Sequence, residues 1–250
     1  MPETLRRLLT RPATFCAITL SVLLLGLGLD HFVTEREQVL LGLCTWAILV
    51  TACWPLSADD RARTAVVVIV ATMAEVIGSI IWGVYHYRLG NLPMFVPPGH
   101  GLVYLTGLRI SQSALARARP RLFVGAMLAV LAGWAAVGLS GALGRMDVAG
   151  AIGAATLAVF ILRGRAPALY AGVFLAVAVL EIYGTAIGTW RWAVEVPGLG
   201  IADGNPPSGA ASGYVLFDIC ALAFGASLLG LVRRLGRRPI AVPAGEAAVP

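Results

Sequence analysis

Residues 64–84, "TAVVVIVATMAEVIGSIIWGV", form an apolar run with a single carboxylate, Glu75, near the middle. About 20 apolar residues suffice to cross the hydrocarbon core of a bilayer. At the helical rise of 1.5 Å per residue, Glu75 would lie roughly 16 Å from the start of such a span. An unpaired carboxylate is costly at that depth, so we expect it to be protonated, paired or facing a polar cavity. The run therefore predicts a transmembrane helix that carries a functional group.

The composition of the whole chain agrees with a membrane protein. The 250 residues are 58% hydrophobic and 13% charged, with a mean hydropathy of +0.83, whereas a soluble domain is nearer a quarter charged. The net charge of +6 comes from 19 cationic residues, all of them arginine. No soluble basic domain is present, so we expect anionic lipids rather than nucleic acid as partners. The cysteines lie in apolar runs without ligand-like spacing, which argues against a disulfide framework or metal site.

The apolar segments predict an all-α, polytopic membrane protein of about eight transmembrane helices. We place them near residues 14–30, 38–56, 64–84, 99–116, 121–143, 148–163, 167–189 and 210–232. The fourth segment contains an arginine and the sixth is short, so a count of seven stays open. Eight spans would put 14 arginines on one side of the membrane and four on the other. The positive-inside rule then predicts that both termini are cytoplasmic, in a cell membrane of the bacterial inner-membrane type.

The features that follow Glu75 recur in the same order after Glu181. The matched residues are Gly78 with Gly184, Tyr85 with Trp190, Tyr87 with Trp192, Pro97-Pro98 with Pro206-Pro207, and Tyr104 with Tyr214. We therefore predict two parallel four-helix repeats, residues 1–118 and 119–238, followed by a disordered tail at 239–250. An even number of spans in each repeat gives both the same orientation, as in transporters with parallel halves. The alternative is a coincidence of residues that are common in loops.

Glu75, Glu181 and His100 are the candidate catalytic residues. Gly78 and Gly184, one turn after each glutamate, would permit close helix approach, so that both carboxylates could face one interior. Two carboxyl groups in a shared site favour a protonated form that can donate a proton near neutral pH. His100 would relay protons or donate a hydrogen bond. Alternatively, each glutamate only caps a neighbouring helix or bonds to an arginine.

Aromatic and polar residues near the two glutamates are candidates for substrate binding. The aromatic pairs Tyr85 with Tyr87 and Trp190 with Trp192 would lie at the outer interface, where aromatic belts are common. Their spacing of two also suits an extended segment that lines a cleft. The remaining candidates are His86, Asn91, Tyr104, Asn205 and Tyr214. Because prolines disfavour helix in the residues before them, we expect both segments to fold back as lids or re-entrant loops.

The sequence also suggests a structural ion pair and no metal. Arg109 and Asp218 occupy matching positions in the fourth and eighth predicted spans, and we expect them to pair across the axis between the repeats. The alternative for Arg109 is snorkelling to the cytoplasmic face. The histidines show no metal-ligand spacing, so we expect neither metal nor cofactor.

One short segment resembles a known family. Its residues are Glu75-x-x-Gly78, Trp82-Gly83-x-Tyr85-x-Tyr87, Leu89-Gly90 and Pro93. This pattern resembles the membrane hydratases of carotenoid biosynthesis, of the bisanhydrobacterioruberin hydratase type. The resemblance covers residues 75–100 and implies acid-catalysed addition of water to an isoprenoid double bond, with Glu75 as the proton donor.

Three hypotheses about function follow from the sequence. The first is a membrane enzyme, hydratase-like or isomerase-like, that acts on a lipid or isoprenoid substrate at an intramembrane site near the extracytoplasmic side. The second is a small proton-coupled transporter, since parallel halves with central carboxylates suit alternating access. The third is a non-catalytic membrane assembly protein. A cavity that joins Glu75, Glu181 and His100 but is closed on the cytoplasmic side would favour the enzyme.

Overall fold

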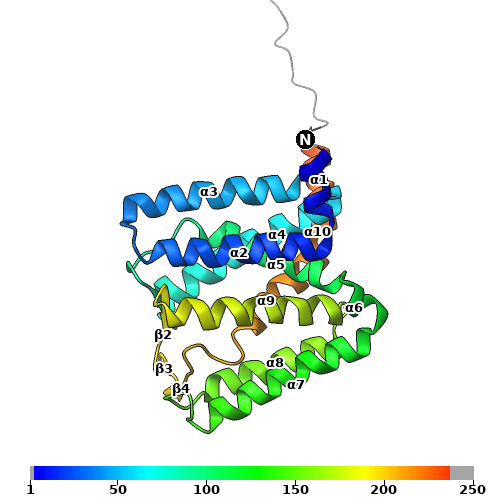
Figure 1. Ribbon diagram of the computed structural model, residues 1–250. Helices are drawn as coiled ribbons and strands as arrows, with labels where there is room; N and C mark the ends of the chain where they lie inside the picture. Colours follow the sequence, from blue (N-terminus) through cyan, green and yellow to red (C-terminus); the bar gives the residue numbers. More distant parts are fainter. Residues whose placement is uncertain (1–2, 237–250) are drawn as a thin grey trace, which may run out of the picture.

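The computed structural model describes residues 3–236, most of which are helical (Figure 1). The helices are α1 (Glu3–Thr10), α2 (Pro12–Asp30), α3 (Glu35–Cys53), α4 (Ala58–Glu75), the π-helix η1 (Val76–Trp82), α5 (Val96–Ser111), α6 (Ala114–Ala118), α7 (Pro120–Leu139), α8 (Val148–Arg163), α9 (Pro167–Ala186) and α10 (Ala211–Gly236). The strands are β1 (Tyr85–Tyr87), β2 (Trp190–Trp192), β3 (Glu195–Val196) and β4 (Ile201–Ala202). A helix therefore overlaps each of the eight segments expected to span. The tail expected to be disordered, 239–250, lies outside the described residues.

Six helices in the described part of the chain are long and apolar enough to cross a membrane. These are α2, α3, α4 with η1, α7, α9 and α10, and they identify the chain as a membrane protein. The other two helices at predicted spans, α5 and α8, have 16 residues each. Such a helix is about 24 Å long, less than a hydrocarbon core of about 30 Å. The count of eight spans therefore stays a prediction.

Local sequence signals set the helix starts. Proline occupies one of the first positions of α2, α7 and α9, where a missing N–H costs no hydrogen bond. Ser57 and Asp147 cap α4 and α8 by accepting a hydrogen bond from a backbone N–H of the first turn. Thr34 and Glu37 form a capping box at the start of α3.

Helices α4, α5, α9 and α10 form the centre of the bundle. Helix α4 packs along α10, and α5 packs along α9. The second contact is close because both helices carry glycine there: a Cβ on Gly107 would come within 2.3 Å of Val173, and one on Gly172 within 2.6 Å of the Gly107 carbonyl. Helix α2 covers α5 and α9, α3 packs on α5, and α7 and α8 pack on α9. The buried core runs through this centre and includes Tyr104 and Phe174.

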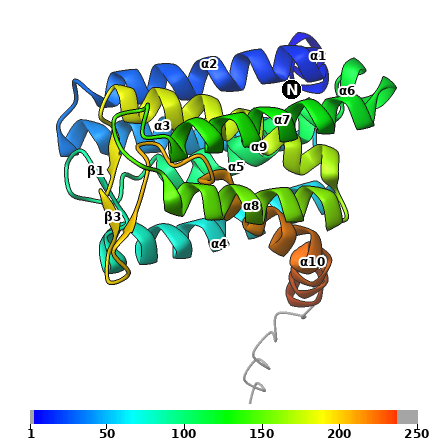
Figure 2. The same cartoon turned by 90° about the horizontal axis from the view of Figure 1, so that it is seen from below.

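The strands gather at one end of the bundle, and α1 and α6 lie at the other (Figures 1 and 2). Strands β1 and β2 pair antiparallel, and β3 and β4 form a second small ribbon. The helices before β1 and β2 end earlier than the predicted spans, because Gly83 and Gly188 adopt positive φ angles of 78° and turn the chain. The segments expected as lids or re-entrant loops thus include paired, extended backbone across the helix ends.

Candidate functional site

Glu75 is the last residue of α4 and is buried. The chain then passes through η1 and turns at Gly83 into β1. Side chains two residues apart on a strand point to the same face, so both tyrosines of β1 reach back to the carboxylate. The Tyr85 hydroxyl donates to Glu75 Oε2 at 2.9 Å, and the Tyr87 hydroxyl donates to the same oxygen at 2.8 Å.

His100 occupies the other oxygen of this carboxylate. It lies in the first turns of α5, and its Nε2 is 2.8 Å from Glu75 Oε1. Both carboxylate oxygens are therefore engaged, Oε2 by two phenols and Oε1 by the imidazole. The His100 ring lies against Tyr214 and Phe217 of α10, with centroids 4.7 and 5.6 Å away. Its Nδ1 is buried and has no hydrogen-bond partner within residues 3–236.

Glu181 is held in a similar way by indoles. It lies in the last turns of α9 and is buried. Trp190 and Trp192 on β2 donate their Nε1–H groups to Glu181 Oε2 at 2.9 and 3.0 Å. Each glutamate near the end of a central helix thus accepts two hydrogen bonds from aromatic side chains of the strand that follows.

Pairing of β1 with β2 brings the two halves of the site together. Tyr85 lies opposite Trp192, and Tyr87 lies opposite Trp190. The rings of Tyr85 and Trp192 are 4.7 Å apart between centroids, and those of Tyr87 and Trp190 are 6.3 Å apart. The pKa of both phenols is raised above the usual value, mainly by burial and secondly by the charge of Glu75. Both phenols therefore remain hydrogen-bond donors at physiological pH.

The glycines after each glutamate have a different role from the one expected. A Cβ on Gly184 would come within 2.1 Å of the Trp190 ring, and one on Gly78 within 3.1 Å of the Tyr85 ring. Both glycines therefore make room for an aromatic ring that folds back over its own helix. The expectation that they serve close helix approach is wrong.

Glu75, Glu181 and His100 line one cavity of about 410 Å³. The four aromatic residues of β1 and β2 and Tyr214 also line it. The rest of the wall is mostly apolar and includes Leu23, Leu27, Val103, Leu180 and Phe217. The cavity thus combines a few polar groups with a hydrophobic lining, as small-molecule sites commonly do. Within residues 3–236, no group of three or more His, Cys, Asp or Glu side chains could hold a metal ion.

Four residues expected to bind substrate do not line this cavity. Tyr104 is buried in the core, one helical turn beyond His100. His86 is exposed, because its position between the two tyrosines points it to the opposite face of β1. Asn91 donates to Gln38 Oε1 at 2.8 Å. Asn205 accepts a hydrogen bond from the Trp192 backbone N–H at 2.9 Å, so it supports the ribbon.

The expected ion pair between Arg109 and Asp218 is absent from the described residues. Arg109 donates to Gln112 at 3.0 Å, and its guanidinium lies 5.4 Å from the centroid of the Phe15 ring. Asp218 is buried, and its Oδ2 has no hydrogen-bond partner within residues 3–236. The two residues match in sequence position, but their helices pack mainly on different partners, α5 on α9 and α10 on α4.

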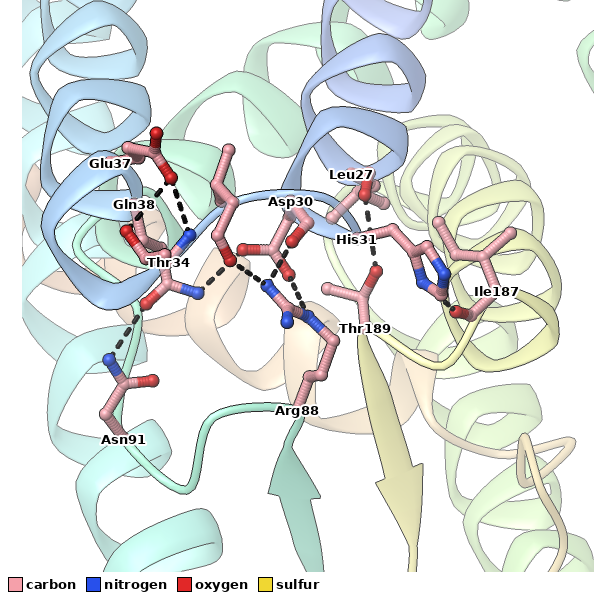
Figure 3. Close-up of polar contacts among 11 residues, drawn as sticks. Leu27, Asp30, His31, Thr34, Glu37, Gln38, Arg88, Asn91, Ile187 and Thr189 are labelled. Carbon is pink, nitrogen blue, oxygen red and sulfur yellow. Dashed lines mark hydrogen bonds and ion pairs between the residues drawn. The ribbon is translucent and has the colours of Figure 1, made fainter.

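A polar network fastens β1 to the turn between α2 and α3 (Figure 3). Arg88 Nη2 donates to the carbonyl oxygens of Asp30 and Val33, and Arg88 Nε lies 3.5 Å from Asp30 Oδ2. Gln38 donates to Asp30 Oδ1 at 2.6 Å and accepts from Asn91. This network was not predicted from the sequence. One feature of the sequence could have indicated it: Asp30 is a carboxylate at the end of an apolar run, as Glu75 is a carboxylate inside one.

The start of β2 is tied to the same turn, and its end is tied to the α7–α8 loop. His31 Nδ1 lies 3.1 Å from the Ile187 carbonyl oxygen, just before β2 (Figure 3). Arg145 donates to the carbonyl oxygens of Trp192 and Gly204, at 3.1 and 2.6 Å. These contacts were not predicted from the sequence.

Asp147 organises the loop that follows the ribbons. It accepts hydrogen bonds from the backbone N–H groups of Gly150, Gly204 and Ser208 at 3.1, 2.9 and 2.8 Å. The pKa of the nearby Asp203 is raised to about 7, mainly because the side chain is buried and secondly because of the charge of Asp147. The two aspartates therefore differ: one is satisfied by three N–H donors, and the other titrates near neutral pH.

Comparisons of this chain with models of known protein families, with curated proteins and with solved structures found no match.

Proposed function

We propose that this protein is a membrane enzyme that performs acid–base chemistry on a carbon–carbon double bond of an isoprenoid or similarly apolar lipid. One observation carries the proposal: two buried carboxylates, one of them bonded to a histidine, line the same apolar cavity. An apolar wall selects an apolar molecule, and paired acid and base groups supply proton transfer. The resemblance of residues 75–100 to carotenoid hydratases suggests the same chemistry.

This arrangement supplies the acid and base groups that addition of water to a double bond would use. The proton shared by Glu75 and His100 is delivered to one carbon of the double bond, which leaves a carbocation on the other. A water molecule adds its oxygen to that cation and gives up a proton to Glu181. The product carries one new C–H bond and one new C–OH bond. A proton then returns from Glu181 to the Glu75–His100 pair through water, which completes the cycle. Loss of a different proton from the cation, without water, would give isomerisation.

The aromatic residues suit a cationic intermediate. Tyr85, Tyr87, Trp190 and Trp192 line the cavity beside the carboxylates, and aromatic faces attract cations most strongly where water is excluded. The same four side chains hold the carboxylates by hydrogen bonds. Their position relative to the acid and base groups is therefore fixed before substrate binds, as electrostatic stabilisation of a transition state requires.

The extent of the cavity favours an enzyme over a transporter. Its lining residues come from the strand end of the bundle. Beyond them, the central helices are filled by side chains that are at most 1% exposed, including Tyr104 and Phe174. Alternating access needs a site that opens to both sides of the membrane. A pure assembly protein would have no use for two carboxylates in one cavity, which would be a costly arrangement.

We infer that the two halves are parallel repeats in a cell membrane, with eight spans and both termini cytoplasmic. Glu75 with β1 and Glu181 with β2 have matching hydrogen bonds, and α4 packs on α10 as α9 packs on α5. The link between α6 and α7 falls at the boundary predicted after residue 118. The arginine-rich segments near α1 and α6 lie away from the strands, which supports a site on the extracytoplasmic side.

The proposal is tested by Glu75→Gln and Glu181→Gln, expressed in cells that make the isoprenoid. Each variant keeps the shape of its side chain and removes its acid–base function. Glu195→Gln is the matched control, because Glu195 is an exposed carboxylate on β3. We expect the first two variants to accumulate unhydrated precursor and the control to resemble the wild type. An unchanged lipid and pigment profile with folded variants would refute the enzyme. Substrate flux in proteoliposomes without product would establish the transporter instead.

A further inference from the structure

The two sides of the cavity are covered unequally. On the side of α5 and α9, α2 packs on both helices and contributes Leu23 and Leu27 to the cavity wall. The counterpart of α2 in the second half is α7, which packs on α8 and α9. Within residues 3–236, α8 packs on α10, but neither α7 nor α8 contributes a residue to the cavity wall, so the side formed by α4 and η1 has no counterpart of α2. In Figure 2, α2 and α4 lie at opposite edges of the bundle.

The rim on this uncovered side is apolar and exposed. Ile77 of η1 and Leu216 of α10 line the cavity and yet are 51% and 47% exposed. Trp82, at the end of η1, also lines it and is 48% exposed. Helix α4 packs along α10, but its continuation η1 packs on β1. The wider turn of a π-helix thus coincides with the place where a cavity-lining residue of η1 becomes exposed.

The other routes into the cavity are obstructed. The β1–β2 ribbon crosses the strand end and is fastened by Arg88 on one side (Figure 3) and by Arg145 on the other. The opposite end is filled by the buried core around Tyr104 and Phe174. An exposed apolar rim in a membrane protein faces acyl chains rather than water.

We propose that the cavity opens sideways into the bilayer, through a portal between η1 and α10 rimmed by Ile77 and Leu216, and receives the end of one long isoprenoid chain. The substrate class rests on the proposed function, whereas the portal rests on the packing. A volume of about 410 Å³ is near the lower end of the range for small-molecule sites. Only the terminal part of a long chain enters, and the rest stays among the lipids.

The test uses the protein in phosphatidylcholine liposomes and all-trans-retinol, an isoprenoid whose binding is followed by energy transfer from tryptophan. The portal variant is Ile77→Phe with Leu216→Phe, which narrows the rim. The matched control is Ile80→Phe with Leu231→Phe, because these residues of η1 and α10 are 53% exposed and do not line the cavity. We expect saturable energy transfer from tryptophan to retinol in the wild type and the control. In the portal variant, the rates of retinol association and dissociation should be at least tenfold lower.

Three outcomes would overturn the portal. They are equal rates in portal and control variants, no saturable binding to the wild type, and faster exchange in a ribbon-loosened Arg88→Gln protein with no effect of the portal variant. Glu75→Gln with Glu181→Gln separates this inference from the proposed chemistry. If these glutamine variants still form product, the catalytic roles of the two glutamates are refuted. If their retinol binding still depends on the portal residues, the portal is supported independently of the chemistry.

Discussion

Replacement of Arg88 by methionine should destabilise the protein strongly, because it leaves a carboxylate buried without its cation. The Asp30 side chain is 1% exposed, and that of Arg88 is 24% exposed. Removal of one partner from a buried ion pair costs about 3–5 kcal/mol. The partial exposure of Arg88 and the remaining hydrogen bond from Gln38 place the expected loss near the lower end, at about 3 kcal/mol.

A double-mutant cycle isolates this interaction. Asp30→Asn removes the charge but can still accept the hydrogen bond from Gln38. The double variant should therefore lose less stability than the sum of the single variants, with a coupling of about 2 kcal/mol, within the range for contacting residues. The free energy of unfolding is measured by titration with sodium dodecyl sulfate in mixed micelles, followed by tryptophan fluorescence.

The control is Arg36→Met, at an exposed arginine of α3. It should change stability by no more than about 0.5 kcal/mol, as exposed substitutions usually do. If Arg88→Met behaved like this control, or if the cycle were additive, then Arg88 would not hold the ribbon to the α2–α3 turn. The structural basis for placing the aromatic residues would then be wrong.

The remaining predictions concern single residues in or near the site. Tyr87→Phe removes one donor to the Glu75 carboxylate, so the hydration rate in liposomes should fall roughly 10- to 100-fold, the equivalent of about 1.5–3 kcal/mol; an unchanged rate would contradict its role. The pKa of Asp203, about 7 when folded, exceeds about 3.9 in an unfolded chain. The Asp203 contribution to stability should therefore fall as pH rises from 4 through 7, and Asp203→Asn should make that slope shallower in unfolding titrations. Gly184→Ala should displace Trp190 and cost about 1–3 kcal/mol in the same assay, whereas Gly125→Ala, with nothing within 4 Å, should be nearly neutral.

The sequence predicted the positions of the helices well because apolar length is a local property. A helix overlaps every predicted segment, although only six described helices satisfy the length and hydropathy needed to span. Helix α5 is too short to span because its two ends are set by local signals. It begins at Val96, next to the Pro97-Pro98 pair, and ends at Ser111, before Ser113 caps α6.

The site was predictable where its signal repeated. Glu75 and Glu181 were identified by their cost inside apolar runs, and the aromatic pairs by their spacing of two; both sets line one cavity. Strand pairing supplied what the sequence did not show, since the register of β1 on β2 decides which rings meet. Tyr104 was misassigned because alignment with Tyr214 does not specify which way a helix faces.

Contacts made by charged residues in loops were the least predictable. Asp30 and Arg88 are 58 residues apart, and neither carries a local pattern that predicts the other. The expected partnership of Arg109 with Asp218 failed for the same reason. A matching depth in two helices does not make them neighbours, and here α5 and α10 pack mainly on other helices.

The most direct test of the central claim is isotope incorporation by the purified protein in liposomes that contain the isoprenoid fraction of its source organism. In water enriched in deuterium and oxygen-18, the wild type should form a product with one solvent oxygen and one non-exchangeable deuterium. Glu75→Gln and Glu181→Gln should each lower its yield at least 100-fold, and Glu195→Gln should not. Labelled product at the wild-type rate from either folded glutamine variant would contradict the account.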